Sequence, residues 1–199
     1  MPEKSLTELD LQALRANRKY FPSPTRWEDE VIYFLLLDRF SDGRENLYRD
    51  NPGNLVTTGS TPPFTPTDNG NAVGTEADAA RWRDAGTRFV GGTLRGLESK
   101  LGYLQRLGVT AVWISPIFKQ VAADDSYHGY GIQDFLDVDA HFGTRADLQR
   151  LVNTAHNMGI RVILDVIVNH SGDVFRYEAN DPTWTGEKFI VRGFRGRRR

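Results

Sequence analysis

The sequence contains no cysteine, so a disulfide framework and a thiolate metal site are both excluded. It also lacks any apolar run near the roughly 18 residues that a membrane-spanning helix requires. Neither sign of charge is in excess, because 25 basic and 26 acidic residues leave a formal net charge of −1. Overall charge therefore gives no reason to expect nucleic acid or a membrane surface as a partner.

The N-terminal segment lacks the features of a secretory signal. It is charged from Glu3 and Lys4 onward and has no continuous apolar stretch. We therefore expect a cytoplasmic and soluble protein. The 39% of hydrophobic and 26% of charged residues are typical of globular proteins, and 199 residues suffice for one domain or part of a larger one.

Three apolar runs predict β-strands that are buried on both faces of a sheet. They are residues 31–37, 109–114 and 160–168, with the sequences "VIYFLLL", "VTAVWI" and "IRVILDVIV". A long segment between the first two runs, residues 41–75, is rich in Gly, Pro, Asn and Thr. It is typical of an irregular loop, which is either functional or a disordered insertion.

Two helices with an apolar face are predicted between these strands. The first has leucines at helical spacing and ends at Gly108; these leucines are Leu94, Leu97, Leu101, Leu104 and Leu107. In the second, Thr144 caps the helix while Asp147 reaches back, and Gly159 ends it. A shorter amphipathic helix is expected within residues 6–18.

The alternation of apolar strands and amphipathic helices predicts an α/β fold with a parallel sheet. Periodicity alone leaves two architectures open, an open doubly wound sheet and a (β/α) barrel. The segment "GGTLRG" precedes a helix, but it follows a loop instead of a strand. It therefore does not match the phosphate-binding turn of a dinucleotide fold.

Polar residues follow each predicted strand, where ligands bind in parallel α/β folds. They are Asp38 and Arg39, then Ser115 and Pro116, then Asn169 and His170. Within the third strand, burying the carboxylate of Asp165 would be energetically costly unless it meets a cation or several hydrogen-bond donors. A purely structural ion pair is the alternative interpretation of Asp165.

The loop before the second helix is rich in aromatic and hydrogen-bonding residues, namely Tyr127, His128, Tyr130 and Asp134. Rings beside polar groups suit sugars, whose C–H faces stack while their hydroxyls bind polar partners. Each of these residues is also common in ordinary loops, as are Asn169 and His170 when taken alone. Composition therefore indicates a sugar site without establishing one.

Several segments together resemble the alpha-amylase family of glycoside hydrolases (glycoside hydrolase family 13). They are "VIYFLLLDRFSDG", "GGTLRGLESKLGYLQRLGVTAVWISPIF", "SYHGYGIQDF" and "DVIVNH". They occur in the family's order over residues 31–175. The resemblance implies an incomplete (β/α)8 TIM barrel, comprising the first three β/α units and the start of the loop domain that follows strand three. The expected divisions are an N-terminal extension at 1–30, the barrel part at 31–170, and loop domain with a truncated basic tail at 171–199.

The resemblance also assigns roles to individual residues. It implies that His128 and His170 hydrogen-bond the sugar at the cleavage subsite, that Tyr130 stacks on it, and that Asp165 is a structural carboxylate beneath. It makes Asn169 an oxygen ligand of a structural Ca²⁺, whose site is incomplete in this chain because the ion takes 6–8 oxygens. A second Ca²⁺ near "DRFSDG" is not expected, since Arg44 stands where an oxygen donor is usual.

The family's catalytic carboxylates follow strands four, five and seven, so none is expected among these residues. The resemblance implies a whole protein that hydrolyses or transfers α-glucosidic bonds of starch-like or α-glucoside substrates by a retaining mechanism. This chain alone is expected to be inactive without the rest of the barrel as its partner. A non-catalytic carbohydrate-binding or regulatory module is the alternative, and an unrelated doubly wound enzyme is a third. The tail "GFRGRRR" is interpreted as a cut or frame-shifted end in preference to a nucleic-acid patch.

Overall fold

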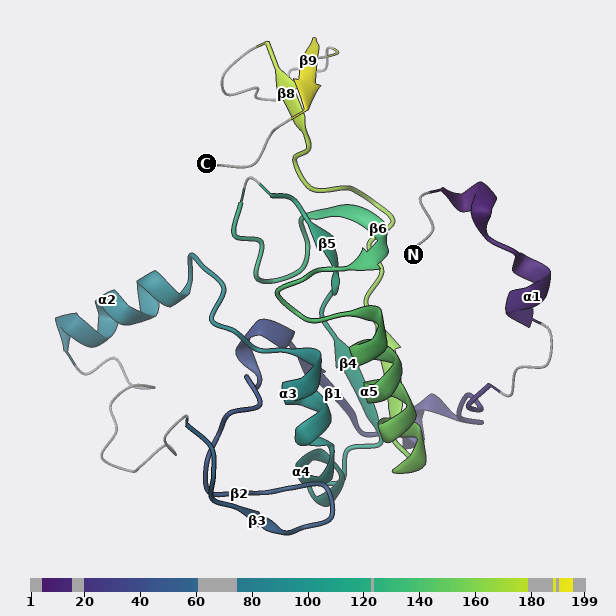
Figure 1. Ribbon diagram of the computed structural model, residues 1–199, viewed down its shortest axis with the longest axis vertical. Helices are drawn as coiled ribbons and strands as arrows, with labels where there is room; N and C mark the ends of the chain where they lie inside the picture. Colours follow the sequence, from purple (N-terminus) through teal and green to yellow (C-terminus); the bar gives the residue numbers. More distant parts are fainter. Residues whose placement is uncertain are drawn as a thin grey trace.

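The centre of the molecule is a parallel sheet of three strands (Figure 1). The computed structural model describes residues 5–15, 20–60, 75–122, 124–178, 188 and 190–194. Strands β1 (Ile32–Leu35), β4 (Ala111–Ile114) and β7 (Arg161–Leu164) lie side by side in the order β1-β4-β7. Both pairs are parallel, as the sequence predicts. Each strand is shorter than its apolar run.

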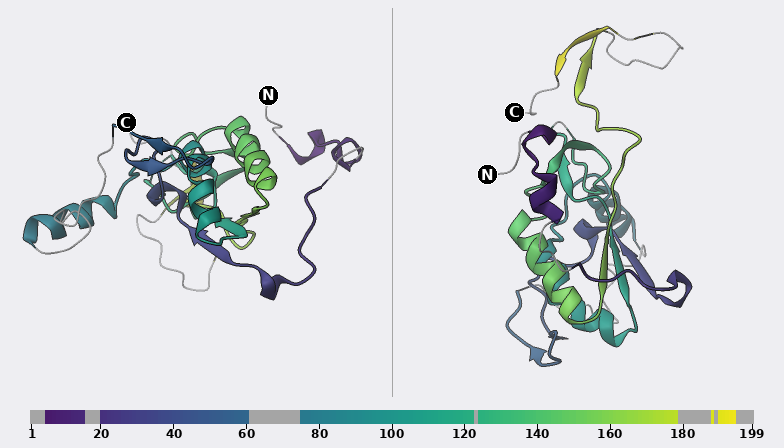
Figure 2. Two further views of the ribbon diagram at one scale, coloured as in Figure 1. Left: turned by 90° about the horizontal axis from the view of Figure 1, so that it is seen from below. Right: turned by 90° about the vertical axis from the view of Figure 1, so that its right-hand side faces the viewer.

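Three helices cover one face of this sheet, α3 (Leu94–Ser99), α4 (Leu101–Arg106) and α5 (Arg145–Asn157), and Figure 2 shows helices and strands as separate layers. The leucine face of α3 and α4 forms a core with Leu35, Val112 and Ile114 of the sheet and with Leu151 of α5. Burial of this apolar surface is the main force that holds the layers together.

The prediction that the strands are buried on both faces is wrong for this structure. In a parallel pair, opposed residues share a face, so Tyr33 and Val112 point toward the helices while Phe34 and Trp113 point away. Phe34 and Trp113 are 45% and 40% exposed. The reason is that the helices lie on one side, and nothing within the described ranges seals the other.

The leucine-rich helix is interrupted at Lys100, where the sequence predicts a continuous helix. The side chain of Asn51 enters this break: its amide donates to the carbonyl of Glu98 at 2.8 Å and its oxygen accepts from the amide of Gly102 at 2.8 Å. Four of the five predicted leucines are fully buried, but Leu107 follows the end of α4 and is 56% exposed. Gly108 ends the helix with a φ of 91°, as predicted.

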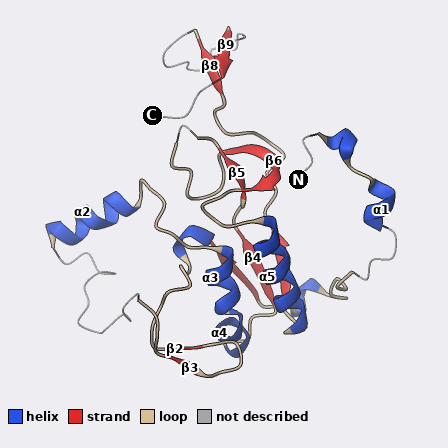
Figure 3. Cartoon of the chain, in the orientation of Figure 1, coloured by secondary structure: helices blue, strands red, loops and turns tan. Residues whose placement is uncertain are grey.

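The remaining elements surround this centre. They are η1 (Leu6–Glu8), α1 (Leu11–Arg15), η2 (Trp27–Asp29), η3 (Leu37–Arg39), β2 (Tyr48–Arg49), β3 (Leu55–Val56), α2 (Glu76–Ala85), β5 (Phe118–Gln120), β6 (Ile132–Val138), β8 (Phe175–Tyr177) and β9 (Val191–Phe194). Figure 3 shows α2 extending away from the sheet and the β8–β9 hairpin standing beyond β5 and β6. In the described ranges, no helix has both the length and the apolarity to cross a bilayer.

Two predicted segments lie partly outside the described residues. The helix expected at 6–18 is observed as η1 and α1, and residues 16–18 are not described. In the loop expected at 41–75, the structure describes residues 41–60 and 75, where β2 and β3 form a short antiparallel pair. That part of the loop is therefore folded against the core instead of being a wholly irregular excursion.

Residues 20–30 lie at the amino-terminal ends of the strands. The carboxylate of Glu30 pairs with the guanidinium of Arg161 at 2.9 Å through both oxygens, and Arg161 also donates to the carbonyl of Pro22 at 3.3 Å. Phe21 stacks on His156 of α5 with ring centroids 4.2 Å apart. Because Glu30 precedes β1 and Arg161 begins β7, the pair joins the two outer strands below β4.

The capping box predicted for α5 is present. Thr144 Oγ1 accepts from the amide of Asp147, and the carboxylate of Asp147 accepts from the amide of Thr144 at 2.9 Å. The same buried carboxylate binds Arg95 at 2.7 Å and Arg150 at 2.8 Å. The hydroxyl of Thr144, followed by the two guanidinium groups, lowers the pKa of Asp147 far below its usual range.

We expect Asp147→Asn to lower the free energy of unfolding by about 2 kcal/mol at pH 7, because the neutral amide loses charge-assisted hydrogen bonds. Since folding depresses the pKa of Asp147, the difference in free energy of unfolding between wild type and variant is fully present above the unfolded pKa of about 4. This difference declines as pH falls toward the folded pKa. Urea unfolding at pH 7 and pH 3 measures the difference and its decline. Asp84→Asn removes an exposed pair with Arg88 and serves as the control, with an expected change below about 0.5 kcal/mol. Equal losses for the two variants would contradict the prediction.

Candidate functional site

The carboxyl-terminal ends of the three parallel strands are connected to one another. After β1, the amide of Leu37 donates to the hydroxyl of Ser115, which follows β4, at 3.2 Å. After β7, the amide of Asp165 donates to the carbonyl of Ile114 at 3.3 Å. The predicted polar clusters therefore meet at a single edge of the sheet.

A loop between β5 and β6 brings the predicted aromatic residues over this edge (Figure 1). Its turn requires glycine at residue 129, where φ is 89° and an added Cβ would lie 1.9 Å from the carbonyl oxygen of Pro116. The side chain of Gln120 on β5 accepts from the amide of Gly131 at 2.8 Å. Close packing against the segment after β4 therefore sets the position of the loop.

Tyr130 is the centre of the site. Its hydroxyl donates to a carboxylate oxygen of Asp165 at 2.9 Å, and its ring stacks on His128 with centroids 5.7 Å apart. Burial, together with the neighbouring Asp165 carboxylate, raises the pKa of Tyr130. The phenol thus remains a neutral donor, held at its tip by Asp165 and along its face by His128.

The contacts of His128 determine which ring nitrogen carries the proton. Its Nδ1 accepts from the amide of Tyr130 at 3.0 Å, so the neutral ring has its proton on Nε2. Burial lowers the pKa of His128, which favours this neutral form. Among the described residues, no hydrogen bond engages this Nε2 proton, so His128 offers one N–H donor.

His170 lies at the same edge and is turned toward Tyr130. Its Nε2 is 3.2 Å from the carbonyl oxygen of Tyr130, which only accepts, so this nitrogen carries the proton. Its Nδ1 is 3.4 Å from the side-chain amide nitrogen of Asn169. The structure thus brings His128, Tyr130 and His170 together, but both nitrogens of His170 already have protein partners. A hydrogen bond from His170 to sugar stays a prediction.

The expectation for Asp165 as a residue of a buried strand is wrong. Strand β7 ends at Leu164, and Asp165 is half-buried in the segment that follows. Among the described residues, its carboxylate binds the phenol of Tyr130 instead of a cation. One neutral donor is sufficient because the carboxylate remains partly exposed to water.

The position of Asn169 is compatible with its predicted role as an oxygen ligand. Its amide nitrogen faces His170 at 3.4 Å, and its side chain is exposed, so its oxygen is accessible. Within the described part of the chain, no group of three or more His, Asp or Glu side chains is arranged to hold a metal ion. The residues thus supply one suitable donor where Ca²⁺ takes 6–8, and the calcium site stays a prediction.

One contact at this edge has no signal in the sequence. The guanidinium carbon of Arg39 lies 3.8 Å from the centre of the Tyr127 ring. Arg39 follows β1 and Tyr127 lies in the loop after β5, so the two residues are remote along the chain. Each is recognisable as a polar or aromatic residue after a strand, but their pairing depends on the fold.

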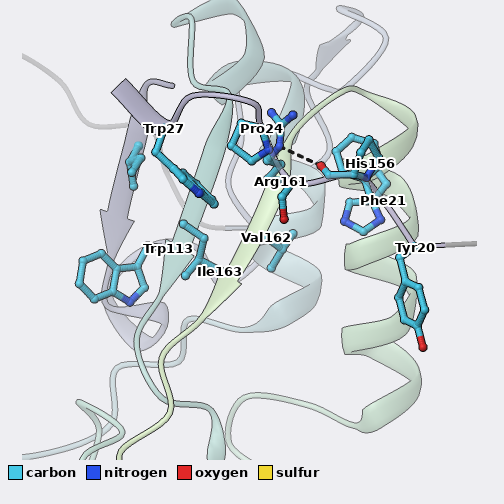
Figure 4. A pocket seen from close by; sticks show the side chains of 12 residues that line it. Tyr20, Phe21, Pro24, Trp27, Trp113, His156, Arg161, Val162 and Ile163 are labelled. Carbon is cyan, nitrogen blue, oxygen red and sulfur yellow. Dashed lines mark hydrogen bonds between the residues drawn. The ribbon is translucent and has the colours of Figure 1, made fainter. Parts of the chain in front are cut away.

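A groove of about 650 Å³ lies at the opposite, amino-terminal end of the sheet (Figure 4). Trp27 and Trp113 are among the rings that line it. Its charged group, Arg161, is already engaged by Glu30 and by a backbone carbonyl. The carboxyl-terminal edge, where His128, Tyr130 and His170 lie together, is therefore the better candidate.

Comparison with known proteins gives a consistent result. A family model described as "Alpha amylase, catalytic domain" matches residues 34–187. The chain is 37% identical over 161 residues to a periplasmic alpha-amylase of Escherichia coli (strain K12), and 39% identical over 156 residues to an alpha-amylase of Streptomyces lividans. Each match covers 75% of this chain, but 20% and 15% of the respective relative, so the chain spans a fifth or less of their length. A solved Anoxybacillus alpha-amylase aligns with a TM-score of 0.52 at 35% identity, covering 75% of this chain and 26% of that chain.

We expect the His128 ring to titrate below about pH 6.5, the ordinary midpoint of histidine, because burial disfavours the imidazolium and its Nδ1 is an acceptor. Between pH 6.5 and the folded pKa, the unfolded chain binds more protons, so stability falls as pH falls through this range. Ring ¹H–¹⁵N spectra recorded against pH measure the midpoint, with His128→Gln to assign the signals. The urea-unfolded chain is the reference, and a native midpoint at or above its value would refute this account.

Proposed function

Because this chain belongs to the alpha-amylase catalytic-domain family, we propose that it forms the first part of the barrel of an enzyme that hydrolyses or transfers α-glucosidic bonds with retention. The parallel sheet with helices over one face agrees with the TIM-barrel fold of that family. Three β/α units, followed by the start of a loop domain at 171–199, are part of this proposal. The boundaries at residues 30 and 170 and the cytoplasmic location stay predictions.

The observation that carries the proposal is the fixed aromatic ring of Tyr130 beside the neutral imidazole of His128. The hydroxyl of Tyr130 is held by Asp165 and its ring is held by His128, so binding a sugar on its face costs little additional side-chain entropy. A pyranose ring presents C–H groups that stack on such a ring, and hydroxyls that accept from the Nε2 proton of His128. The substrate class that fits is an α-glucan or α-glucoside.

Asn169 would contribute its side-chain oxygen to a structural Ca²⁺, with the other ligands supplied from outside the described residues. Bound there, the ion would supply positive charge that holds the segment after β7 in place. Since Asn169 also contacts His170, ordering this segment would fix the orientation of the imidazole. The same contact would relate calcium binding to the sugar site.

We further propose that this 199-residue chain alone has no hydrolase activity. A retaining glycosidase needs a nucleophile and an acid/base carboxyl group about 5–5.5 Å apart. At the candidate site, the carboxylate of Asp165 is bound to the phenol of Tyr130. By family resemblance, the reacting carboxylates belong to later strands, so the rest of the barrel is the partner that this chain requires. Loss of acid–base catalysis alone costs about 10²–10⁴-fold in rate.

We expect purified chain to bind maltoheptaose without cleaving it. Titration followed by NMR should show saturable binding that Tyr130→Ala weakens about tenfold, because the stacking face is lost. Tyr103→Ala, which removes an exposed ring on α4, is the matched control and should leave binding unchanged. Reducing-sugar assays on starch and maltooligosaccharides measure turnover.

The outcomes separate the hypotheses. Clear turnover by the purified chain would disprove its inactivity, and binding insensitive to Tyr130→Ala would disprove the site. The alternative of a carbohydrate-binding or regulatory module predicts the same binding. It differs in predicting no turnover when the chain is assayed as part of its complete natural protein.

A further inference from the structure

The segment after β1 carries a buried carboxylate, Asp38 of η3, that contacts both backbone amides and an arginine side chain. Asp38 is 2% exposed, and its oxygens accept from the amides of Val90 at 2.9 and 3.0 Å and of Gly91 at 3.0 Å. One oxygen also pairs with Nε of Arg39 at 2.9 Å. Because two backbone amides donate to it, the buried carboxylate is fixed in place, and its negative charge attracts the adjacent Arg39 guanidinium.

The other side of the guanidinium is fixed as well. Its Nη2 donates to the carbonyl of Arg88 at 3.0 Å, and its flat face lies on Tyr127 with 3.8 Å between Cζ and the ring centre. The group therefore joins two segments, residues 88–91 and the aromatic loop. A planar guanidinium suits this position because it hydrogen-bonds along its edge while its face stacks on an aromatic ring.

From Tyr127 the ring contacts continue into the candidate site. Tyr127 meets His128 edge to face at 5.3 Å between centroids, and His128 stacks on Tyr130 at 5.7 Å. The same loop packs closely against the backbone of Pro116 at Gly129. The His128 ring is thus in contact with two aromatic rings, Tyr130 and Tyr127, and Tyr127 in turn carries the guanidinium of Arg39.

We propose that Arg39 is a positioning residue, which orients the His128 ring toward substrate by holding Tyr127 against it. This inference rests on the proposed function, because it assigns to Arg39 a role in the same sugar site. Arg39 itself does not touch the sugar in this account. It acts through one aromatic ring, so the ring and the guanidinium should be needed together.

The experiment compares four variants of the full 199-residue chain. Arg39→Met keeps an unbranched apolar side chain but removes the charge and the planar guanidinium, and Tyr127→Leu removes the ring. Tyr127→Phe keeps the ring and is expected to retain wild-type behaviour. Arg49→Met removes an arginine of β2 that binds the carbonyl of Gly53, and is the matched control for loss of a guanidinium.

Two readouts are recorded for each variant. In ¹H–¹³C spectra without ligand, Arg39→Met and Tyr127→Leu should shift the His128 ring signals in the same direction, while Tyr127→Phe and Arg49→Met should not. In maltoheptaose titrations, the first two variants should bind about tenfold more weakly, equal to about 1.4 kcal/mol. Thermal midpoints identify any variant that is unfolded. If Arg39→Met is unfolded, the comparison of Tyr127→Leu with Tyr127→Phe tests the proposal.

Unchanged His128 ring signals in folded Arg39→Met or folded Tyr127→Leu would overturn the positioning role, whatever the measured affinity for maltoheptaose. If instead wild-type chain fails to bind maltoheptaose while the His128 signals still depend on Arg39, the proposed sugar site fails and the role of Arg39 in substrate binding fails with it. Arg39 would then act on the loop alone. Weaker binding with unshifted His128 signals would also count against the inference, because the effect would not pass through that ring.

Discussion

The structure depends on burial of one face of a three-stranded parallel sheet by helices that cross over it. Because each strand starts at the same end, every strand finishes at the same edge, and every following segment begins there. Polar groups that follow different strands, such as Arg39 and Asp165, therefore lie at one edge, and the loop between β5 and β6 adds Tyr130 to them. The apolar core positions the site, and the site residues themselves contribute little to that core.

The features that sequence reasoning predicts correctly are local or periodic. The helix face from Leu94 to Leu104 repeats every three or four residues, and the capping box of Thr144 and Asp147 uses neighbouring residues. Parallel pairing follows from the alternation of strands and helices. Family motifs then place His128, Tyr130 and His170 at a common edge, where the structure brings them together.

The features that sequence reasoning misses come from contacts between distant segments. Asn51 interrupts the leucine-rich helix, and no pattern within that helix reveals its presence. One-sided burial of β1 and β4 cannot be deduced from apolar runs, because a strand with one exposed apolar face has the same sequence pattern as a strand that is buried on both faces. The stack of Arg39 on Tyr127 and the turn of His170 toward Tyr130 depend likewise on side-chain geometry that motifs do not encode.

The order of the strands has a consequence for how the polypeptide acquires its shape during translation. Strand β1 pairs with β4 from Ile32 opposite Ala111 onward, so the first strand leaves the ribosome long before its neighbour has been made. Pairing between strands so distant in sequence implies slow formation of the sheet. Until β4 has been made, the apolar β1 has unpaired backbone groups and is prone to mispairing. Nascent chains of this protein thus pass through an interval in which chaperones have an exposed apolar segment to bind.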